Sequence, residues 1–175
     1  SARPYPSYVG ASQVSVLRKL GSTAAYQRAS VSLNGLLSDG TSRSVAHLAS
    51  FATSNSNLLG VSGDMLLPES AGTVDVTASW LVHTSTIKVT VSASAVTLVS
   101  LDISTVFGAT FNDDLNSTSM VRVAAEFDDG TQYGDIVSGA SSAWVSARDL
   151  VLFSSSEESA LSVEPDGLIT LRHNY

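Results

Sequence analysis

The sequence predicts an all-β protein of two tandem antiparallel β-sandwiches, the second incomplete within this chain. Three observations predict this. Apolar and polar residues alternate in short segments separated by turn residues, which is typical of strands. A set of short motifs occurs twice in the 175 residues, which indicates two related units. The second set stops before its last strands have a counterpart.

The first twelve residues (1–12) are expected to form an extended segment that acts as a strand donor or an inter-domain linker. Pro4 and Pro6 flank Tyr5 at its start. Proline lies at strand edges rather than inside ladders, so these prolines would mark a crossover between subunits. Pro4, Tyr5 and Pro6 are therefore candidate interface residues, and the wider stretch Arg3 to Leu20 is the candidate donor. Because the chain begins Ser1-Ala2-Arg3 without Met, we expect it to be processed or cut from a longer polypeptide.

The first unit is expected over residues 13–95. The best helical candidate, Val14 to Tyr26, is interrupted by Gly21 and has no convincing cap. The clearest strand is Thr73 to Trp80, whose alternate apolar residues place Trp80 on the core face. A short link at His83-Thr84-Ser85 leads to a second alternating run, so the two runs predict an antiparallel hairpin that closes the unit.

The second unit, over residues 96–175, repeats the motifs of the first at a growing offset. The turn Asp39-Gly40-Thr41 recurs 90 residues later at Asp129, and Phe51 recurs 102 residues later at Phe153. The difference indicates an insertion of about twelve residues around Tyr133 to Leu150. This insertion contains Trp144. Tyr133 and Trp144 are candidate interface residues, although packing against their own sheet is the alternative for Trp144.

By the same offset, the counterparts of the last two strands of the first unit would lie beyond Tyr175. We therefore expect the second sandwich to expose a core face and unpaired strand edges, which proteins rarely leave open. Two completions are consistent with the sequence. The missing strands come from further along the same polypeptide, or another molecule adds a strand. Both produce a linear array.

Composition excludes several classes of protein. The net charge of −7 and the presence of only two lysines among 175 residues argue against nucleic-acid binding. No apolar run approaches the roughly 18 residues of a membrane span. Cysteine is absent, which excludes disulfides and thiolate metal sites. Charged residues are only 14%, while 32 serines and 14 threonines supply a hydroxyl-rich surface suited to close packing or to a coat of sugar.

No pattern predicts a catalytic or metal site. The acidic pairs at Asp113 and Asp128 lack the loop that calcium requires, so turn and cap roles explain them. The three histidines, His47, His83 and His173, share no metal-ligand spacing. No serine lies in a nucleophile elbow, and the pair Glu157-Glu158 lies in a serine-rich turn. We therefore expect no metal, no cofactor and no enzymatic activity.

Glycans are the modification that the sequence suggests. Asn116-Ser117-Thr118 is an acceptor for N-linked glycosylation in a polar stretch. A plain loop is the alternative at Asn116. The serine-rich stretches Ser138 to Ser142 and Ser154 to Ser156 are candidates for O-linked sugar, and plain solvated loops explain these two stretches equally well.

The motifs resemble the bacterial Ig-like group 2 (Big2-type) repeat. The first unit carries them at Ser38 to Thr41, Phe51 to Val61 and Gly72 to Trp80, and the second at Phe127 to Thr131 and Leu152 to Leu171. Similar repeats occur in tandem in bacterial surface adhesins and in algal mastigoneme-like cell-surface fibre proteins. The resemblance implies Ig-like sandwiches that act as spacer or stalk modules, and fold alone does not fix function.

Together these observations predict an extracellular structural module of a surface fibre or filament. It would assemble end to end, by β-strand pairing and domain packing, with copies of itself or with adjacent Ig-like repeats. The alternative is an adhesin or carbohydrate-binding module on a cell-surface stalk. Regular filaments without a saturable ligand would favour the first function, and exposed aromatic residues in the insertion with saturable glycan binding would favour the second.

Overall fold

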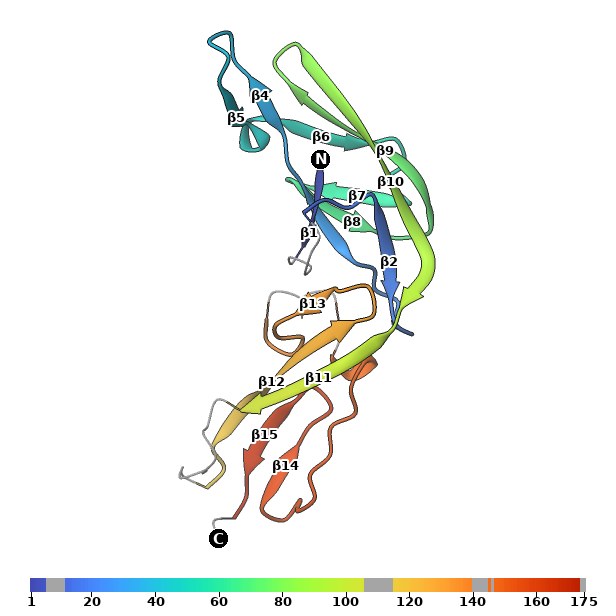
Figure 1. The fold of residues 1–175 in the computed structure, drawn as a ribbon. Helices are drawn as coiled ribbons and strands as arrows, with labels where there is room; N and C mark the ends of the chain where they lie inside the picture. Colours follow the sequence, from blue (N-terminus) through green and yellow to red (C-terminus); the bar gives the residue numbers. More distant parts are fainter. Residues whose placement is uncertain (6–11, 106–114, 140–144, 146, 174–175) are drawn as a thin grey trace. The chain divides into compact units, whose positions relative to one another are not determined.

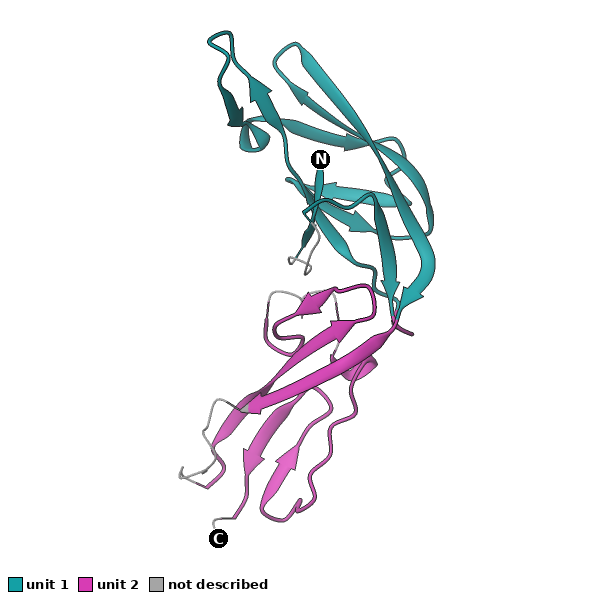
Figure 2. Cartoon of the chain, in the orientation of Figure 1, with its two compact units in different colours: residues 1–20, 24–96 teal, residues 21–23, 97–175 magenta. Residues whose placement is uncertain are grey.

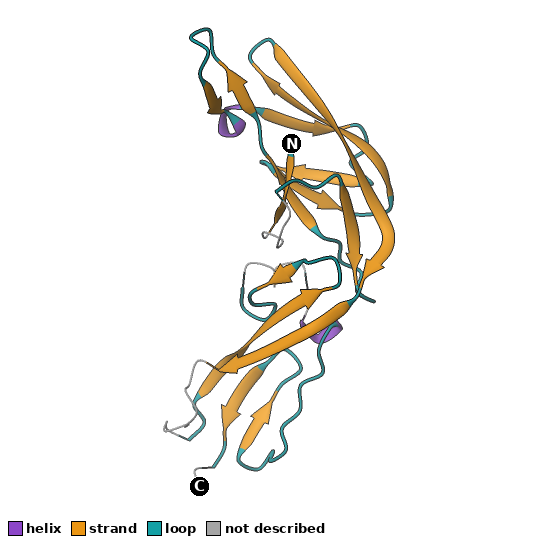
Figure 3. Cartoon of the chain, viewed as in Figure 1, coloured by secondary structure: helices purple, strands orange, loops and turns teal. Residues whose placement is uncertain are grey.

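The computed structural model describes residues 1–5, 12–105, 115–139, 145 and 147–173. Most of the regular secondary structure in these residues is β-strand, and the two 3₁₀ turns among them are short (Figure 3). This confirms the all-β prediction. The chain divides into two compact units (Figure 2). Unit 1 comprises residues 1–20 and 24–96, and unit 2 comprises residues 21–23 and 97–175. The main boundary therefore falls after Val96.

Unit 1 contains two four-stranded sheets and a separate two-stranded hairpin (Figure 1). The first sheet has the order β1 (Ala2–Tyr5), β3 (Arg28–Val31), β8 (Met65–Pro68), β7 (Leu59–Ser62). The second has the order β2 (Val16–Leu20), β10 (His83–Val96), β9 (Gly72–Trp80), β6 (Ser50–Thr53). The hairpin pairs β4 (Asn34–Leu36) with β5 (Ser42–Ser44), and the 3₁₀ turn η1 (Ala46–Leu48) follows it.

The two sheets of unit 1 share one buried core. Alternate residues of β9 point inward, and Val74 and Val76 are almost completely buried. They belong to one hydrophobic cluster with Ala29 and Leu66 of the first sheet and Val89 of β10. A core shared between two sheets is the layer arrangement of a sandwich, so the predicted fold of this unit is confirmed.

The outer face of β9 and β10 is built from paired hydroxyl groups. The side-chain oxygens of Thr73 and Thr90 lie 3.1 Å apart, and those of Thr77 and Thr86 lie 3.0 Å apart. Between these pairs, the Lys88 ammonium lies 3.1 Å from the carboxylate of its cross-strand neighbour Asp75. Direct cross-strand pairs of this kind stabilise a sheet modestly. The hydroxyl-rich composition is thus reflected in regular cross-strand pairs of threonine side chains on this face.

One ladder of unit 1 departs from the predicted antiparallel pattern. β10 pairs with β2 in parallel, with Val91 opposite Leu17, whereas the other ladders between described strands are antiparallel. The stretch from Val14 to Tyr26 therefore contributes a strand. No short turn joins β2 to β10, so the antiparallel geometry of a hairpin does not apply to them.

The N-terminal segment is a strand of unit 1 over its described residues. β1 pairs antiparallel with β3, with Ala2 opposite Val31, and the Ser1 amino group donates a hydrogen bond to the Ser32 carbonyl. Residues 2–5 of the predicted extended segment 1–12 are thus a β-strand, and this strand pairs within its own chain. Its position at the edge of the sheet still agrees with the preference of proline for edge strands.

Unit 2 contains one sheet in its described residues, with the order β11, β12, β15, β14, and β13 pairs with β12. The 3₁₀ turn η3 lies near the end of the insertion. The bounds are β11 (Leu98–Thr105), β12 (Thr118–Phe127), β13 (Gln132–Tyr133), η3 (Ala147–Asp149), β14 (Leu161–Val163) and β15 (Leu168–Leu171).

This sheet repeats the first sheet of unit 1. β11, β12, β15 and β14 follow in the same order as β1, β3, β8 and β7. The described part of unit 2 contains no strand that corresponds to β9 or β10. The insertion contributes part of the interior instead. Four of its residues are buried: Tyr133, Ile136, Val145 and Ala147.

Candidate interaction surfaces

The repeated Asp-Gly-Thr turns position hairpins in both units through the same hydrogen bonds. The Asp39 carboxylate accepts from the Thr41 N–H at 2.9 Å and from its hydroxyl at 2.7 Å. The Asp129 carboxylate accepts from the Thr131 N–H at 3.0 Å and from its hydroxyl at 2.6 Å. The hydroxyl of Thr41 is the largest cause of the lowered pKa of Asp39. These acidic residues are turn formers, as predicted.

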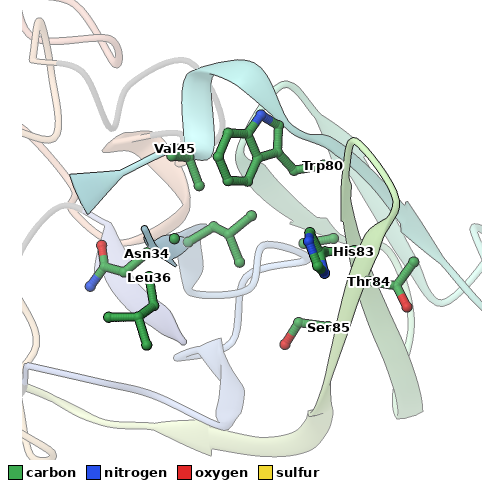
Figure 4. Close-up of a pocket in the computed structure, with 10 residues that line it drawn as sticks. Asn34, Leu36, Val45, Trp80, His83, Thr84 and Ser85 are labelled. Atoms are coloured by element: carbon green, nitrogen blue, oxygen red, sulfur yellow. The ribbon is translucent and has the colours of Figure 1, made fainter. Parts of the chain in front are cut away.

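A groove of about 280 Å³ lies in unit 1 between β4 and the β9–β10 hairpin. Figure 4 shows residues of β4 on one side and residues of β10 on the other, with Trp80 and Val45 at one end. A Cβ atom on Gly35 would lie 2.9 Å from the Trp80 ring, so glycine lets the indole approach β4 closely. Lining residues include Asn34, Leu36, Val45, Trp80, His83 and Ser85.

Trp80 lies between core and surface. It shares the inward face of β9 with Val76 and Ala78, as predicted, but it is half-buried because it stands at the end of the strand. The predicted link at His83-Thr84-Ser85 is wrong. These residues belong to β10, and the turn is formed by the two residues between Trp80 and His83.

That turn exposes two aliphatic side chains. Leu81 is 82% exposed and Val82 is 90% exposed, and Leu36 on the other side of the groove is also exposed. We call Leu36, Leu81 and Val82 the tip patch. Sequence reasoning missed this patch, although a signal existed: Trp80-Leu81-Val82 joins two strands without the Gly, Asn or Asp that hairpin turns favour.

A second apolar surface lies on β11. Leu101 pairs with Ala125 of β12, and Ile103 pairs with Val123. Directly paired residues share one face of a sheet. Ala125 and Val123 are buried, whereas Leu101 is 39% exposed and Ile103 is 57% exposed. The same face is thus covered at β12 and open at β11. We call the three exposed aliphatic residues of this strand the uncovered face: Val99, Leu101 and Ile103.

Unit 1 shows how such a face is normally covered. β1, which corresponds to β11, contributes the buried Ala2 to a core that also contains Leu17 of β2 and Val89 of β10. A further difference lies at Leu152 and Phe153, which correspond to β6. In unit 1, Phe51 of β6 pairs with Ala78 of β9. The corresponding stretch of unit 2 is not a strand, and Leu152 is 92% exposed.

The predicted interface residues lie in different places. The structure corrects the prediction for Tyr133, because its side chain is only 1% exposed. Its ring packs edge-on against the ring of Phe127, with 5.9 Å between the two centroids, so Tyr133 is a core residue. Pro4 and Tyr5 are half-buried in β1. Pro6 and Trp144 lie outside the described residues. The described candidates therefore belong to different units, with Pro4 and Tyr5 in unit 1 and Tyr133 in unit 2.

Asn116, the candidate for glycosylation, is exposed in a turn before β12. Its φ is +69°, in the left-handed region that asparagine tolerates better than most residues. Its backbone N–H donates to the Leu171 carbonyl at 2.7 Å. The side chain is thus presented to solvent by a backbone that is held in place. Glycosylation itself stays a prediction.

Asp135 ties the insertion to β12. Its Oδ1 atom accepts hydrogen bonds from the backbone N–H of Val137 at 2.9 Å and of Val123 at 3.4 Å. Ser138 donates to the same carboxylate through its N–H at 3.2 Å and its hydroxyl at 2.6 Å. Partial burial raises the pKa of this carboxyl, but the hydrogen bonds, led by the Ser138 hydroxyl, lower it by more. The pKa of Asp135 therefore lies below its ordinary range.

Replacing Asp135 with alanine is expected to destabilise unit 2 by about 1–3 kcal/mol at neutral pH, because bonds to a charged acceptor are lost. A lowered folded-state pKa gives stability that is present above the unfolded pKa, about 3.9, and is lost as the pH falls through the folded pKa. The difference between the native protein and Asp135→Ala should therefore shrink in acid. Urea denaturation at about pH 7 and about pH 2 measures it. Asp102→Ala, an exposed change on β11, is the control and should alter the free energy of unfolding by no more than about 0.5 kcal/mol at neutral pH.

Other classes of site are not found in the described residues. No three His, Asp or Glu side chains there are grouped so that they would hold a metal ion. Within the same part of the chain, no helix has the length and hydrophobicity that a membrane crossing requires.

The chain matches no protein-family model and no curated protein. Among solved structures, it aligns with a crystal structure of domains 4 and 5 of the S-layer protein SbsC at 14% identity and a TM-score of 0.41, covering 100% of this chain and 88% of that one. Structures of SbsC domains 4–9 and 1–6 align over 100% of this chain, with TM-scores of 0.40 and 0.35 and identities of 13% and 14%. The alignments span 27% and 25% of those two chains. Likeness at this level identifies neither a family nor a function.

Proposed function

We propose that this chain is an extracellular structural module of a cell-surface fibre or filament. It joins end to end with copies of itself through β-structure and domain packing. The proposal includes the predicted resemblance to Big2-type repeats, the surface location and the absence of enzymatic activity. Its partners are other polypeptides of the same kind rather than a small-molecule substrate.

The observation that carries the proposal is the uncovered face of unit 2. A sheet whose inner face is buried at β12 and exposed at Leu101 and Ile103 has an unfinished core. Exposed apolar strips beside a buried core are favourable sites for association, because covering them removes apolar surface from water. Among the described residues, the ladders pair β11 with β12 alone, so its other edge is where strand addition would occur.

The remaining surface suits a packed array. Charged residues make up 14% of the chain, and the outer face of β9 and β10 carries hydroxyl pairs such as Thr77 with Thr86. Neutral hydroxyl surfaces approach one another without the repulsion that an excess of like charges produces. This composition supports a module that packs closely against its neighbours.

The proposal is tested by the self-association of the 175-residue chain. Analytical ultracentrifugation over a concentration series should detect reversible assembly, and electron microscopy should show extended arrays. Ile103→Lys places a charge on the uncovered face and should weaken association by about tenfold or more. Ser100→Lys is the matched control, because it adds the same charge to the same strand on the opposite face, where its cross-strand partner is Glu126.

The two variants separate a specific contact from a general charge effect. Ser100→Lys should associate like the native chain within about twofold, since an exposed charge on the other face of the strand changes affinity little. A native chain that stays monomeric at its highest soluble concentration contradicts the proposal. Equal weakening by both variants contradicts the assignment of the contact to the uncovered face.

The second candidate function is an adhesin or carbohydrate-binding module. The groove favours it, because an indole beside amide and hydroxyl groups can stack on and hydrogen-bond a sugar ring. Trp80, Asn34 and Ser85 would be the contacting residues. Saturable binding to a glycan, lost in Trp80→Ala, together with an absence of self-association would favour this function over the first.

A further inference from the structure

We propose that the tip patch of one copy docks on the uncovered face of the next copy. This inference rests on the proposed self-assembly and names the two surfaces that meet. The tip patch belongs to unit 1 and the uncovered face to unit 2, so the contact joins two different surfaces. A contact between unlike surfaces does not close on itself unless a ring forms, and it otherwise repeats as an open array.

The backbone conformation of Leu81 supports a contact at the tip patch. Leu81 and Val82 form the two-residue turn between Trp80 and His83, and only Leu81 of the two has a positive φ, +54°. This is the pattern of a type II′ turn, which strongly favours glycine at that position. A leucine there adopts an unfavourable backbone conformation while its side chain stays 82% exposed. Local stability does not explain the choice of residue, whereas an apolar contact with a partner does.

The distribution of charged residues also supports a contact between these two surfaces. The chain has a net charge of −7, so two copies repel each other except where neither surface is charged. From Ser79 to Ile87 there is no Asp, Glu, Lys or Arg, and the residues that line the groove also lack them. The uncovered face is aliphatic, with Asp102 on the opposite side of its strand. The two surfaces are therefore both apolar and free of like-charge repulsion.

The shapes of the two surfaces support the contact as well. The groove beside the tip patch has a volume of about 280 Å³ and is bordered by Leu36 and Trp80, so aliphatic side chains that stand out from a sheet can enter it. Val82, at 90% exposure, projects from the turn next to the groove. On unit 2, the side chains of Leu101 and Ile103 stand beside the buried half of the same face. Projecting and recessed apolar features are thus present on both partners.

The double variant Leu81→Gly/Val82→Ser tests the contact from the side of unit 1. Its self-association should weaken by about tenfold or more, because two exposed aliphatic side chains are removed. Its thermal stability should be equal to or higher than that of the native chain, because glycine suits the turn. A stable variant that assembles as the native chain does overturns the inference, and the matched control Leu48→Ser, on the exposed turn η1, should leave association unchanged.

Disulfide trapping tests which surfaces meet. The chain has no cysteine, so single substitutions give unambiguous products. Val82→Cys on one copy and Ile103→Cys on a second, tagged copy should form a mixed disulfide under mild oxidation at least about tenfold faster than Val82→Cys with Asp102→Cys. The comparison is direct because Asp102 and Ile103 are neighbours on opposite faces of β11. Equal rates, or a product dominated by pairing of like variants, overturn the inference.

These outcomes distinguish this inference from the proposed function. If the native chain assembles and Ile103→Lys weakens assembly, but the tip variant assembles normally, then the uncovered face takes another partner surface and only this inference fails. If the native chain does not assemble at all, the proposed function fails with it.

Discussion

Replacing Tyr133 with alanine is expected to unfold unit 2 while unit 1 stays folded. Tyr133 is almost completely buried and meets the ring of Phe127. Removing a buried aromatic side chain typically lowers the free energy of unfolding by about 3–5 kcal/mol. Small domains have only about 5–15 kcal/mol in total, and a unit with one sheet and an open face has little to spare. The loss should therefore remove most of the stability of unit 2.

Hydrogen–deuterium exchange measured on peptides locates this effect. Protection should be lost in β12 and β15 and retained in β9 and β10, because the two units are separate compact bodies. Tyr133→Phe retains the ring and should keep unit 2 protected. If Tyr133→Ala left the protection of unit 2 intact and changed only the association between copies, Tyr133 would be the interface residue that the sequence suggests.

The interpretation of Tyr133 shows where sequence reasoning stops. The repeats define the turns well, because an Asp-Gly-Thr turn depends on hydrogen bonds within three residues. Asp39 and Asp129 accordingly accept the same bonds from the same partners. The insertion has no counterpart in the first unit, so the repeat gives no information about which of its side chains point inward. Which side chains of the insertion are buried depends on their tertiary contacts with the sheet of unit 2.

The parallel ladder between β2 and β10 also could not be predicted from the sequence. Strand pairing between residues as distant as Leu17 and Val91 leaves no local pattern, and Val14 to Tyr26 carries weak signals for both helix and strand. The candidate site was found only in part. The repeat pattern leads to the expectation of an open face in unit 2, and Leu101 and Ile103 are exposed there. The tip patch depends on the exact position of a turn, which lies at Leu81 and Val82, two residues before the link expected at His83-Thr84-Ser85.

The parallel ladder leads to the second large expected effect, the loss of stability in Leu17→Ala. Leu17 is 0% exposed and belongs to the core cluster of unit 1, while its neighbour Val16 is 42% exposed. Truncating a buried leucine to alanine typically lowers the free energy of unfolding by about 2–5 kcal/mol, through lost burial and the cavity that remains. Val16→Ala changes the adjacent residue on the other face and should lower it by no more than about 0.5 kcal/mol.

Urea denaturation of both variants, followed by exchange protection in β9, measures this difference. The contrast tests the closure of the sandwich, because Leu17 is buried only if β2 lies on β10 and covers the core that β1 and β3 share. Similar small losses in Leu17→Ala and Val16→Ala would mean that β2 does not close unit 1. In that case the core face of unit 1 would also be open, and unit 1 would no longer serve as the template for how the inner face of unit 2 is covered.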